Sequence, residues 1–407
     1  MENVVIVGAS LAGVHAAEGL RERGYVGSIT MIDGVSGSVA DRPPLSKAAL
    51  SGAVQFDDCT LRPDTWALDL KVTYRTGRSV VALDTAAGTV TLEDGHELSF
   101  DGLVIATGLR PRPAPWLPPQ TPGVHVLRNR ADSETLREHL LSASSVAVVG
   151  GGFLGLEVAA TARSMGLTVT VLEYERSVLA RVLPDSVGEW FTNVHERHGV
   201  EVRTGVAVSS ISQTRTGFNV QLSNEDAIYA DVVVAALGAD PVTEWLSGSS
   251  VDFEDGVLCK PDLSTSVPGI VAAGDVARWP HPVTGKSVRL EHWTNAVEQG
   301  RHAAGTLLGE SYPFSAVPYF WTDQFDARAR FVGWVSPHHE AYVKSTGPDS
   351  LVVAFGDRGE MQGAVCVNAP KELALMRRLI DQGTLWSEIV DSGEANGDLS
   401  ASHVGRV

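Results

Sequence analysis

The feature that most constrains the fold is a glycine-rich turn that occurs twice, each time between a strand-like apolar run and a segment with helical spacing. The first unit has its strand, turn, helix and second strand at 3–7, 8–13, 11–23 and 28–32, and the second unit has them at 145–149, 150–155, 154–165 and 168–172. An acidic residue follows each second strand. A βαβ unit that recurs after about 140 residues predicts an α/β chain with two Rossmann-like dinucleotide sites.

The second turn reads Gly-Gly-Gly-Phe-Leu-Gly from Gly150 to Gly155 and matches the G-x-G-x-x-G pattern. Its glycines permit the close approach of a pyrophosphate to the amino end of a helix. Glu173 lies 18 residues beyond Gly155. A carboxylate there accepts hydrogen bonds from ribose hydroxyls and repels a 2′-phosphate, so it favours NADH over NADPH. The alternative is a loop that only turns tightly.

The first turn departs from the pattern, because Ser10 stands where the second glycine is expected. Serine is small, and its hydroxyl is able to donate to a phosphate oxygen. Asp33 lies 20 residues beyond Gly13, again at the ribose position. The alternative is a Rossmann-like unit that has lost its ligand.

Two further strand ends indicate which ligand the first unit takes. Ala106-Thr107-Gly108 ends one buried run, and Gly274-Asp275 ends another. A carboxylate just past a parallel strand is well placed to accept the hydroxyls of a ribityl chain, which favours FAD over a second nicotinamide. Either feature alone is an ordinary strand end.

Charge and composition exclude several classes of function. The net charge of −17 argues against nucleic acid and against an anionic membrane surface as partners. There is no apolar run near 20 residues, and only two residues precede the first strand, so we expect neither a transmembrane helix nor a signal peptide. Three separate cysteines indicate a soluble, cytoplasmic protein without disulfides or zinc. The pairs His195 with His198 and His338 with His339 are expected to be solvated surface rather than metal ligands.

The remainder of the chain predicts a change of architecture after residue 313. A proline-rich stretch at 111–122 is expected to be a domain crossing. A buried strand is expected at 231–237 and a long helix at 291–308, then antiparallel strands at 331–335, 350–355 and 361–367, a helix at 372–380 and a frayed tail from Ser392.

In order along the chain, these motifs resemble the two-dinucleotide flavoprotein reductases. They are the first turn, Arg-Pro-Pro-Leu-Ser-Lys at 42–47, Ala-Thr-Gly at 106–108, the second turn with Gly-Leu-Glu at 155–157, and Ala-Gly-Asp at 273–275. The closer resemblance is to the FAD-dependent NADH:ferredoxin reductases that serve Rieske-type dioxygenases and bacterial haem monooxygenases. It covers residues 3–385 and is most specific at 42–47, 291–300 and 319–326. The last segment departs from the family's Tyr-Phe-Trp-Ser-Asp-Gln-Tyr-Asp at Thr322 and Phe325.

The resemblance implies a glutathione-reductase-like architecture of three domains. An FAD-binding domain is split between 1–111 and 236–314, an NADH-binding domain occupies 112–235, and a C-terminal α/β domain occupies 315–407 and packs its front edge on the flavin.

Position within the motifs assigns the cofactor-binding residues. The FAD side comprises Gly8, Ser10, Ala12, Gly13, Asp33, Arg42, Lys47, Ala106, Thr107, Gly108, Gly274, Asp275, Glu291, His292, Trp293 and Trp321. The NADH side comprises Gly150, Gly152, Phe153, Leu154, Gly155, Glu157 and Glu173, and Arg128 and Gly238 complete the set.

The resemblance also implies three catalytic residues. Lys47 and Glu157 are expected to meet as an ion pair near flavin N5 and the nicotinamide, and Trp321 is expected to lie against the isoalloxazine. Read alone, Lys47 is a solvated charge, Glu157 an exposed helix residue and Trp321 a core indole. Only their places in the motifs favour the functional interpretation.

The implied activity is that of an NADH-dependent ferredoxin reductase. FAD takes a hydride from NADH and passes single electrons to a 2Fe-2S ferredoxin, which feeds a haem monooxygenase or Rieske oxygenase. Segment 34–47 contains no cysteine, so no thiol relay is expected. Docking of an acidic ferredoxin requires a local basic patch on the surface of the reductase. The chain is expected to be a monomer or a weak dimer. Candidates for the patch, which are otherwise scattered solubilising charges, are Arg62, Arg330, Lys344, Lys371, Arg377 and Arg378.

Three alternatives stay open. In the first, the electron acceptor is rubredoxin, a quinone or oxygen instead of a ferredoxin. In the second, the chain is an NADH-sensing flavoprotein without turnover, as in the more distant apoptosis-inducing relatives. In the third, the chain has lost FAD at the Ser10 turn.

Overall fold

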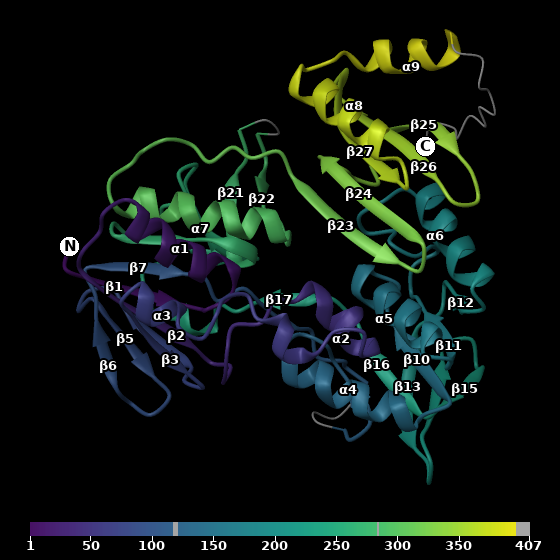
Figure 1. The fold of residues 1–407 in the computed structure, drawn as a ribbon, viewed down its shortest axis with the longest axis horizontal. Helices are drawn as coiled ribbons and strands as arrows, with labels where there is room; N and C mark the ends of the chain where they lie inside the picture. The colour runs from purple at the N-terminus through teal and green to yellow at the C-terminus, as the bar shows by residue number, and fades with distance from the viewer. Residues whose placement is uncertain (117–120, 283–284, 396–407) are drawn as a thin grey trace. The chain divides into compact units, whose positions relative to one another are not determined.

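The structure is a computed structural model that describes residues 1–116, 121–282 and 285–395. The chain forms two compact units, and Figure 1 labels many of their helices and strands. Unit 1 consists of Met1–Arg42, Gln55–Arg112 and Ala239–Ala316, and unit 2 consists of Pro43–Val54, Pro113–Gly238 and Val317–Val407. One boundary falls in the proline-rich stretch, of which residues 117–120 lie outside the described residues. The three-domain boundaries implied by the resemblance stay a prediction.

Unit 1 is built on a five-stranded parallel sheet in the order β20-β7-β1-β2-β3. Its strands are β1 (Asn3–Val7), β2 (Ser28–Asp33), β3 (Val72–Thr76), β7 (Gly102–Ile105) and β20 (Ile270–Ala272). Apolar side chains alternate between two buried cores, with Val4 and Ile6 on one face and Val5 and Val7 on the other. A sheet covered on both faces explains why these strands read as unbroken apolar runs.

Helices α1 (Leu11–Glu22) and α7 (Trp293–Leu307) pack side by side against the first of these cores (Figure 1). The other elements of unit 1 are short. They are η2 (Phe56–Cys59), α3 (Trp66–Asp69), β4 (Val80–Asp84), β5 (Thr89–Leu92), β6 (Glu97–Ser99), β8 (Leu109–Pro111), β17 (Ala239–Pro241), η3 (Glu244–Leu246), β18 (Phe253–Glu254), β19 (Gly256–Leu258), η4 (Gly274–Val276), β21 (Ala277–Pro280) and β22 (Ser287–Val288).

Unit 2 repeats this plan with the parallel order β12-β11-β10-β16-β9. Its strands are β9 (Val124–His125), β10 (Ser145–Val149), β11 (Thr168–Leu172), β12 (Glu201–Arg203) and β16 (Val232–Ala235). An antiparallel meander, which the sequence analysis did not predict, packs on one face of the sheet. It consists of β13 (Val208–Gln213), β14 (Phe218–Leu222) and β15 (Ala227–Ala230), and the helical elements are η1 (Pro43–Ser46), α2 (Ala48–Ser51), α4 (Arg130–Ser142), α5 (Phe153–Ser164) and α6 (Asp185–Arg197).

The C-terminal part of unit 2 is an antiparallel sheet in the order β23-β24-β27-β26-β25, with helices α8 and α9 on one face. The elements are β23 (Tyr319–Gln324), β24 (Ala327–Gly333), β25 (Glu340–Thr346), β26 (Leu351–Asp357), β27 (Glu360–Val367), α8 (Pro370–Asp381) and α9 (Trp386–Ala395). Helix α9 continues past Ser392, where the sequence predicted a frayed tail, and residues 396–407 lie outside the described residues.

The two glycine-rich turns have the same local geometry. Gly8 and Gly150 adopt φ of +106° and +112°, which favour glycine. A Cβ on Gly8 would lie 2.1 Å from the Ala106 carbonyl oxygen, and one on Gly150 would lie 2.2 Å from that of Ala236. Each turn therefore abuts the residue that follows a neighbouring parallel strand, and the sequence repeat is a structural repeat.

The contact between α1 and α7 depends on small residues. A Cβ built on Gly300 would lie 2.4 Å from the Ala12 carbonyl oxygen. Since backbone atoms cannot move aside cheaply, we expect Gly300→Ala to lower the free energy of unfolding by about 2 kcal/mol, as overpacked cores do. Urea unfolding followed by far-UV circular dichroism measures this.

The matched control is Gly305→Ala in the same helix. The three nearest atoms to a Cβ there belong to the ends of the Glu310 and Arg23 side chains, an ion pair that can shift at a lower cost than backbone, and alanine gains up to about 1 kcal/mol in helix propensity. Equal stabilities of the two variants would contradict the close helix contact.

Candidate functional site

The first glycine-rich turn joins β1 to α1 in unit 1. Ser10 is the N-cap residue of α1, and its side chain makes no capping hydrogen bond. A Cβ on Gly13 would lie 1.9 Å from the Gly8 carbonyl oxygen, so this turn closes only on glycine. The helix thus presents N–H groups at a compact turn, which is the arrangement that receives a pyrophosphate.

Asp33 ends β2 beside this turn. Burial raises the pKa of its carboxyl above the ordinary value, while the N–H of Val35, the guanidinium of Arg42 and the N–H of Ala9 lower it. The Val35 N–H donates to Oδ1 at 3.0 Å. A partly desolvated carboxylate at this strand end gains from a hydroxyl donor, as the ribose assignment requires.

The predicted strand ends flank the same turn. Thr107 donates its hydroxyl to the Val242 carbonyl at 2.7 Å, with Ala106 and Gly108 on either side of it. A Cβ on Gly274 would lie 2.8 Å from the Ala12 Cβ, which places the turn after β20 against the start of α1.

Gln299 is a residue at this site that the sequence analysis missed. It is fully buried in α7, and its Oε1 accepts the Gly274 N–H at 2.8 Å. Its Nε2 has no hydrogen-bond partner among the described residues. A buried, unpaired amide donor beside the glycine-rich turn is stabilised by a polar ligand, so the residues of unit 1 fit FAD.

The segment before α7 contributes three predicted residues. Trp293 donates its indole N–H to Asp41 Oδ1 at 3.0 Å. His292 is the N-cap residue of α7, and burial lowers its pKa to about 4 against the opposing charge of Asp275. Glu291 is exposed and accepts a hydrogen bond from Arg289 at 2.9 Å.

The second turn, in unit 2, leads from β10 into α5. A Cβ on Gly155 would lie 2.0 Å from the Gly150 carbonyl oxygen, whereas a Cβ on Gly152 would meet nothing within 4 Å. The space in front of Gly152 leaves room for a ligand to approach the backbone. The turn therefore fits the pyrophosphate of a nicotinamide dinucleotide.

Glu173 ends β11 and is buried. Its Oε2 accepts the Gly151 N–H at 2.5 Å, and its Oε1 accepts the Glu175 N–H at 2.8 Å. The carboxylate therefore holds the glycine-rich turn in addition to its predicted ribose contact.

Other predicted NADH residues lie around the start of α5. Phe153 makes edge-to-face contacts with Phe320 and Phe331, at centroid distances of 5.1 and 5.4 Å. Leu154 is exposed. Arg128 precedes α4, where its backbone N–H donates to Asp132 at 2.8 Å, and Gly238 follows β16 with φ of +93°.

The structure brings Lys47 and Glu157 together in unit 2. Lys47 Nζ lies 2.8 Å from Glu157 Oε2. The Ser46 hydroxyl donates to the same oxygen at 2.6 Å, and the Thr322 hydroxyl donates to Oε1 at 2.7 Å. Glu157 is only 8% exposed, so this carboxylate depends on these donors for its solvation.

The hydrogen bonds continue beyond this carboxylate. Gln324 Nε2 lies 3.1 Å from Thr322 Oγ1, and Gln324 Oε1 lies 2.9 Å from His195 Nε2. His195 is 0% exposed, so the prediction that it is solvated surface is wrong. It lies on the apolar face of α6 with Phe191 and Val194.

Trp321 is half-buried on β23, and neighbouring side chains on a strand point to opposite faces. Trp321 therefore lies on the face opposite Thr322, in line with Tyr319, whose ring centroid is 6.3 Å away. The structure does not bring Trp321 to the Lys47–Glu157 pair.

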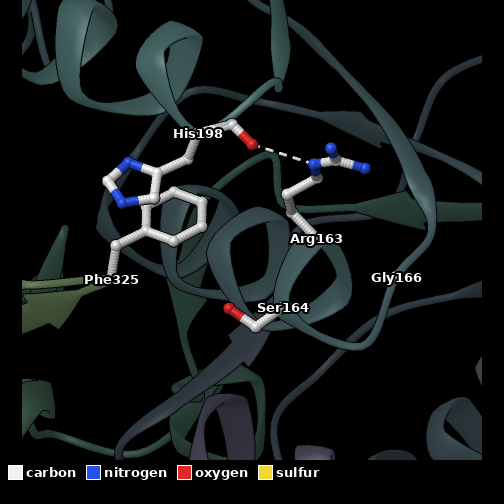
Figure 2. Close-up of a pocket in the computed structure, with 5 residues that line it drawn as sticks. All are labelled: Arg163, Ser164, Gly166, His198 and Phe325. Carbon is white, nitrogen blue, oxygen red and sulfur yellow. Dashed lines mark hydrogen bonds between the residues drawn. The ribbon is translucent and has the colours of Figure 1, made fainter.

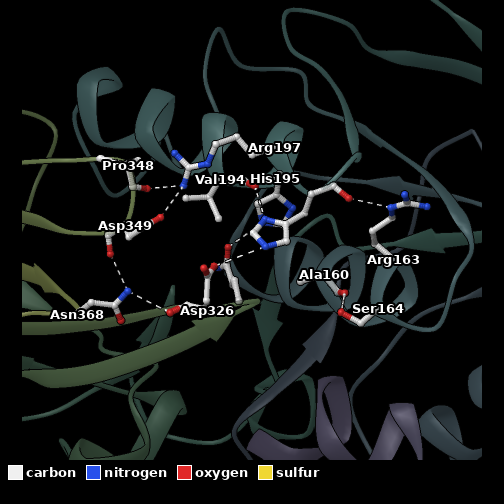
Figure 3. Close-up of polar contacts among 12 residues, drawn as sticks. Ala160, Arg163, Ser164, Val194, His195, Arg197, Asp326, Pro348, Asp349 and Asn368 are labelled. Carbon is white, nitrogen blue, oxygen red and sulfur yellow. Dashed lines mark hydrogen bonds and ion pairs between the residues drawn. The ribbon is translucent and has the colours of Figure 1, made fainter.

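A shallow pocket of about 290 Å³ lies in unit 2 (Figure 2) and is lined by Arg163, Ser164, Gly166, His198 and Phe325. The rings of His198 and Phe325 stack at 4.0 Å, and Arg163 donates to the His198 carbonyl at 2.8 Å. Nearby, Asn368 donates to the carbonyls of Asp326 and Asp349 (Figure 3). None of the predicted site residues lines this pocket.

The candidate basic residues differ in their surroundings. Arg62 pairs with Glu18, Arg330 with Asp323 and Lys344 with Glu372. The other three are exposed side chains of α8, namely Lys371, Arg377 and Arg378.

The cysteines are free. Burial raises the pKa of both Cys259 and Cys366 to about 12, so both are protonated thiols at neutral pH. Cys59 is buried. Within the described parts of the chain, no helix is long and apolar enough to cross a membrane.

Comparison with known proteins identifies two family models along the chain. The pyridine nucleotide-disulphide oxidoreductase model matches residues 2–300, and the reductase C-terminal model matches residues 319–391. Rhodocoxin reductase of Rhodococcus erythropolis is 35% identical over 383 residues, which cover 93% of this chain and 89% of the relative. The ferredoxin–NAD(+) reductase subunit of the benzene 1,2-dioxygenase system of Pseudomonas putida is 34% identical over 399 residues, with coverages of 98% and 96%.

A solved structure, that of the covalent putidaredoxin reductase–putidaredoxin complex, matches with a TM-score of 0.89 and 31% identity over 97% of this chain and 99% of that chain. The predicted α/β fold with Rossmann-like units is confirmed, and FAD and NADH are the cofactors of the family. The chain therefore belongs to the pyridine nucleotide-disulphide oxidoreductases and, within them, to the FAD-dependent ferredoxin reductases that its motifs resemble.

Proposed function

We propose that this oxidoreductase passes electrons from NADH to a 2Fe-2S ferredoxin that serves a monooxygenase or a Rieske dioxygenase. Bound FAD supplies the ability to accept two electrons together and to release them singly. The observation that carries the proposal is the set of two dinucleotide turns joined to a C-terminal reductase domain, over nearly the whole length of relatives named for such systems.

The residues of the two turns are proposed to bind the two cofactors. In unit 1, the turn starting at Gly8 would hold the FAD pyrophosphate, with Asp33 and Asp275 accepting its hydroxyls. In unit 2, the turn starting at Gly150 would hold the NADH pyrophosphate, with Glu173 at the ribose.

The Lys47–Glu157 pair is proposed to act at the reacting rings. The ammonium of Lys47 is only partly exposed and is held by a buried carboxylate. Fixed in this way, it would orient the nicotinamide and favour negative charge that develops nearby. No side chain is required as a general acid or base.

The cysteines support direct exit of electrons from the cofactor. Disulfide reductases relay electrons through a cysteine pair, but the three thiols here are free, and two of them have a pKa raised to about 12. A thiol that stays protonated is a poor nucleophile and a poor redox relay. Electrons would therefore pass straight to the protein partner.

We propose that the exposed cations of α8, Lys371, Arg377 and Arg378, contribute to ferredoxin docking. The other three candidates are already paired with carboxylates of their own unit, which leaves less charge to attract an acidic partner. Trp321 is proposed to influence electron exit rather than hydride transfer, because it lies away from the ion pair.

Stopped-flow mixing of the yellow protein with NADH, followed by reoxidation, tests the proposed function. We expect fast reduction, then fast reoxidation by a 2Fe-2S ferredoxin and slow reoxidation by rubredoxin, a quinone or oxygen. A persistent long-wavelength charge-transfer band with slow reoxidation by every acceptor would instead indicate the NADH-sensing alternative.

The choice between NADH and NADPH should depend on the charge of Glu173. We expect Glu173→Gln to raise the NADPH-to-NADH ratio of kcat/KM about tenfold, equivalent to about 1.4 kcal/mol, because the 2′-phosphate no longer meets a carboxylate. Steady-state reduction of ferricyanide with each nucleotide measures this ratio.

Glu175→Gln is the matched control, since it removes a charge two residues further along. An unchanged ratio in Glu173→Gln, or an equal change in both variants, would rule out the ribose assignment.

Retention of FAD should depend on Asp275. We expect Asp275→Ala to lose most of its bound FAD, because the ribityl hydroxyls lose their acceptor. The ratio of flavin to protein absorbance of the purified variant measures occupancy. The control is Asp94→Ala, which removes an exposed carboxylate of the same unit, and full occupancy in Asp275→Ala would show that the assignment is wrong.

A further inference from the structure

A row of buried polar side chains in unit 2 leads from α6 to the Lys47–Glu157 pair. The row consists of His195, Gln324 and Thr322, which are 0%, 0% and 1% exposed. Successive members lie 2.9 and 3.1 Å apart, and Thr322 lies 2.7 Å from Glu157. Buried polar groups that touch one another in sequence act as a connected network.

The direction of every hydrogen bond in this row follows from the charge of Glu157. A carboxylate beside an ammonium is ionised and only accepts, so the Thr322 hydroxyl must donate to it. A hydroxyl has one proton, and Thr322 Oγ1 therefore accepts from Gln324 Nε2. The Gln324 amide then turns its Oε1 to His195, whose Nε2 must carry a proton.

The neutral imidazole of His195 agrees with this direction. Burial lowers the pKa of His195 to about 4, so the ring is uncharged at neutral pH. Its Nδ1 is buried and has no hydrogen-bond partner among the described residues, which leaves it as the unprotonated nitrogen. His195 lies on α6 and is labelled beside Val194 in Figure 3.

We propose that His195, Gln324 and Thr322 are positioning residues, which form a one-way row of donors that orients the Glu157 carboxylate and, through it, the ammonium of Lys47. Each donor in the row points toward Glu157, so the bond dipoles add at the carboxylate. An amide does not pass protons along by rotation, and the row therefore orients the pair rather than conducting protons. Its kinetic role rests on the proposed function of that pair.

The variants are chosen to separate the hydroxyl from its volume. Thr322→Val keeps the shape and removes the donor, whereas Thr322→Ser keeps the donor. We expect Thr322→Val to lower the limiting rate of flavin reduction by NADH about tenfold with less than a twofold change in the Kd for NADH, and Thr322→Ser to restore the rate. Asp323→Asn, on the opposite face of the same strand, is the control and should retain the wild-type rate.

A second measurement tests the direction of the row without any activity. Long-range ¹H–¹⁵N NMR of the histidine-labelled holoprotein reports which ring nitrogen carries the proton. Subtraction of the His195→Phe spectrum isolates His195. We expect the Nε2–H tautomer in the wild type and a shift of its Nε2 resonance in Gln324→Leu.

The outcomes distinguish this proposal from the proposed function. A protonated Nδ1 on His195, an unchanged rate in Thr322→Val, or equal losses in the valine and serine variants would each overturn the positioning row. If NADH fails to reduce the wild-type flavin while His195 shows the Nε2–H tautomer, then the proposed function fails and the row of donors stands.

Discussion

The interaction on which the local structure of unit 2 depends is the binding of the buried Glu157 carboxylate by its hydrogen-bond donors and its ion-pair partner. The carboxylate accepts hydrogen bonds from Ser46 and Thr322 and pairs with Lys47, so it joins three segments that are far apart in sequence. A buried carboxylate is costly when it loses a partner, commonly by about 3–5 kcal/mol. The positions of segment 43–54, α5 and β23 are therefore coupled, because a movement of any one of them would leave the Glu157 carboxylate exposed to solvent or without a partner.

Much of the fold was predictable, because its strands are buried on both faces and their boundaries are marked by glycine. The predicted runs 3–7, 145–149 and 168–172 coincide with β1, β10 and β11. Both glycine-rich turns sit where the repeat placed them. The meander of β13, β14 and β15 was missed, because its strands include many polar residues, and most residues of β13 and β15 are not buried.

Site residues could be predicted only where they lie within a recognisable sequence motif. Lys47 and Glu157 lie in separate motifs, and the resemblance alone suggested that they meet. His195 was misread as surface because it was compared with His198 instead of with the apolar face of its own helix, where Val187, Phe191 and Val194 repeat at helical spacing. Gln299 gave no signal, since a single glutamine in a helix is usually solvated and its burial depends on α1 and Gly274.

Glu173 has a consequence for how nucleotide preference can change in this family. The carboxylate that would select the ribose is also the acceptor for the Gly151 N–H inside the phosphate-binding turn. Replacement of Glu173 by a smaller or basic residue, which would admit a phosphorylated nucleotide, also removes the acceptor of the Gly151 N–H and so loosens the turn. If Glu173 selects the ribose as proposed, a smaller or basic residue at this position calls for a second substitution that supplies a new acceptor to Gly151, whereas glutamine keeps an oxygen that can accept this N–H.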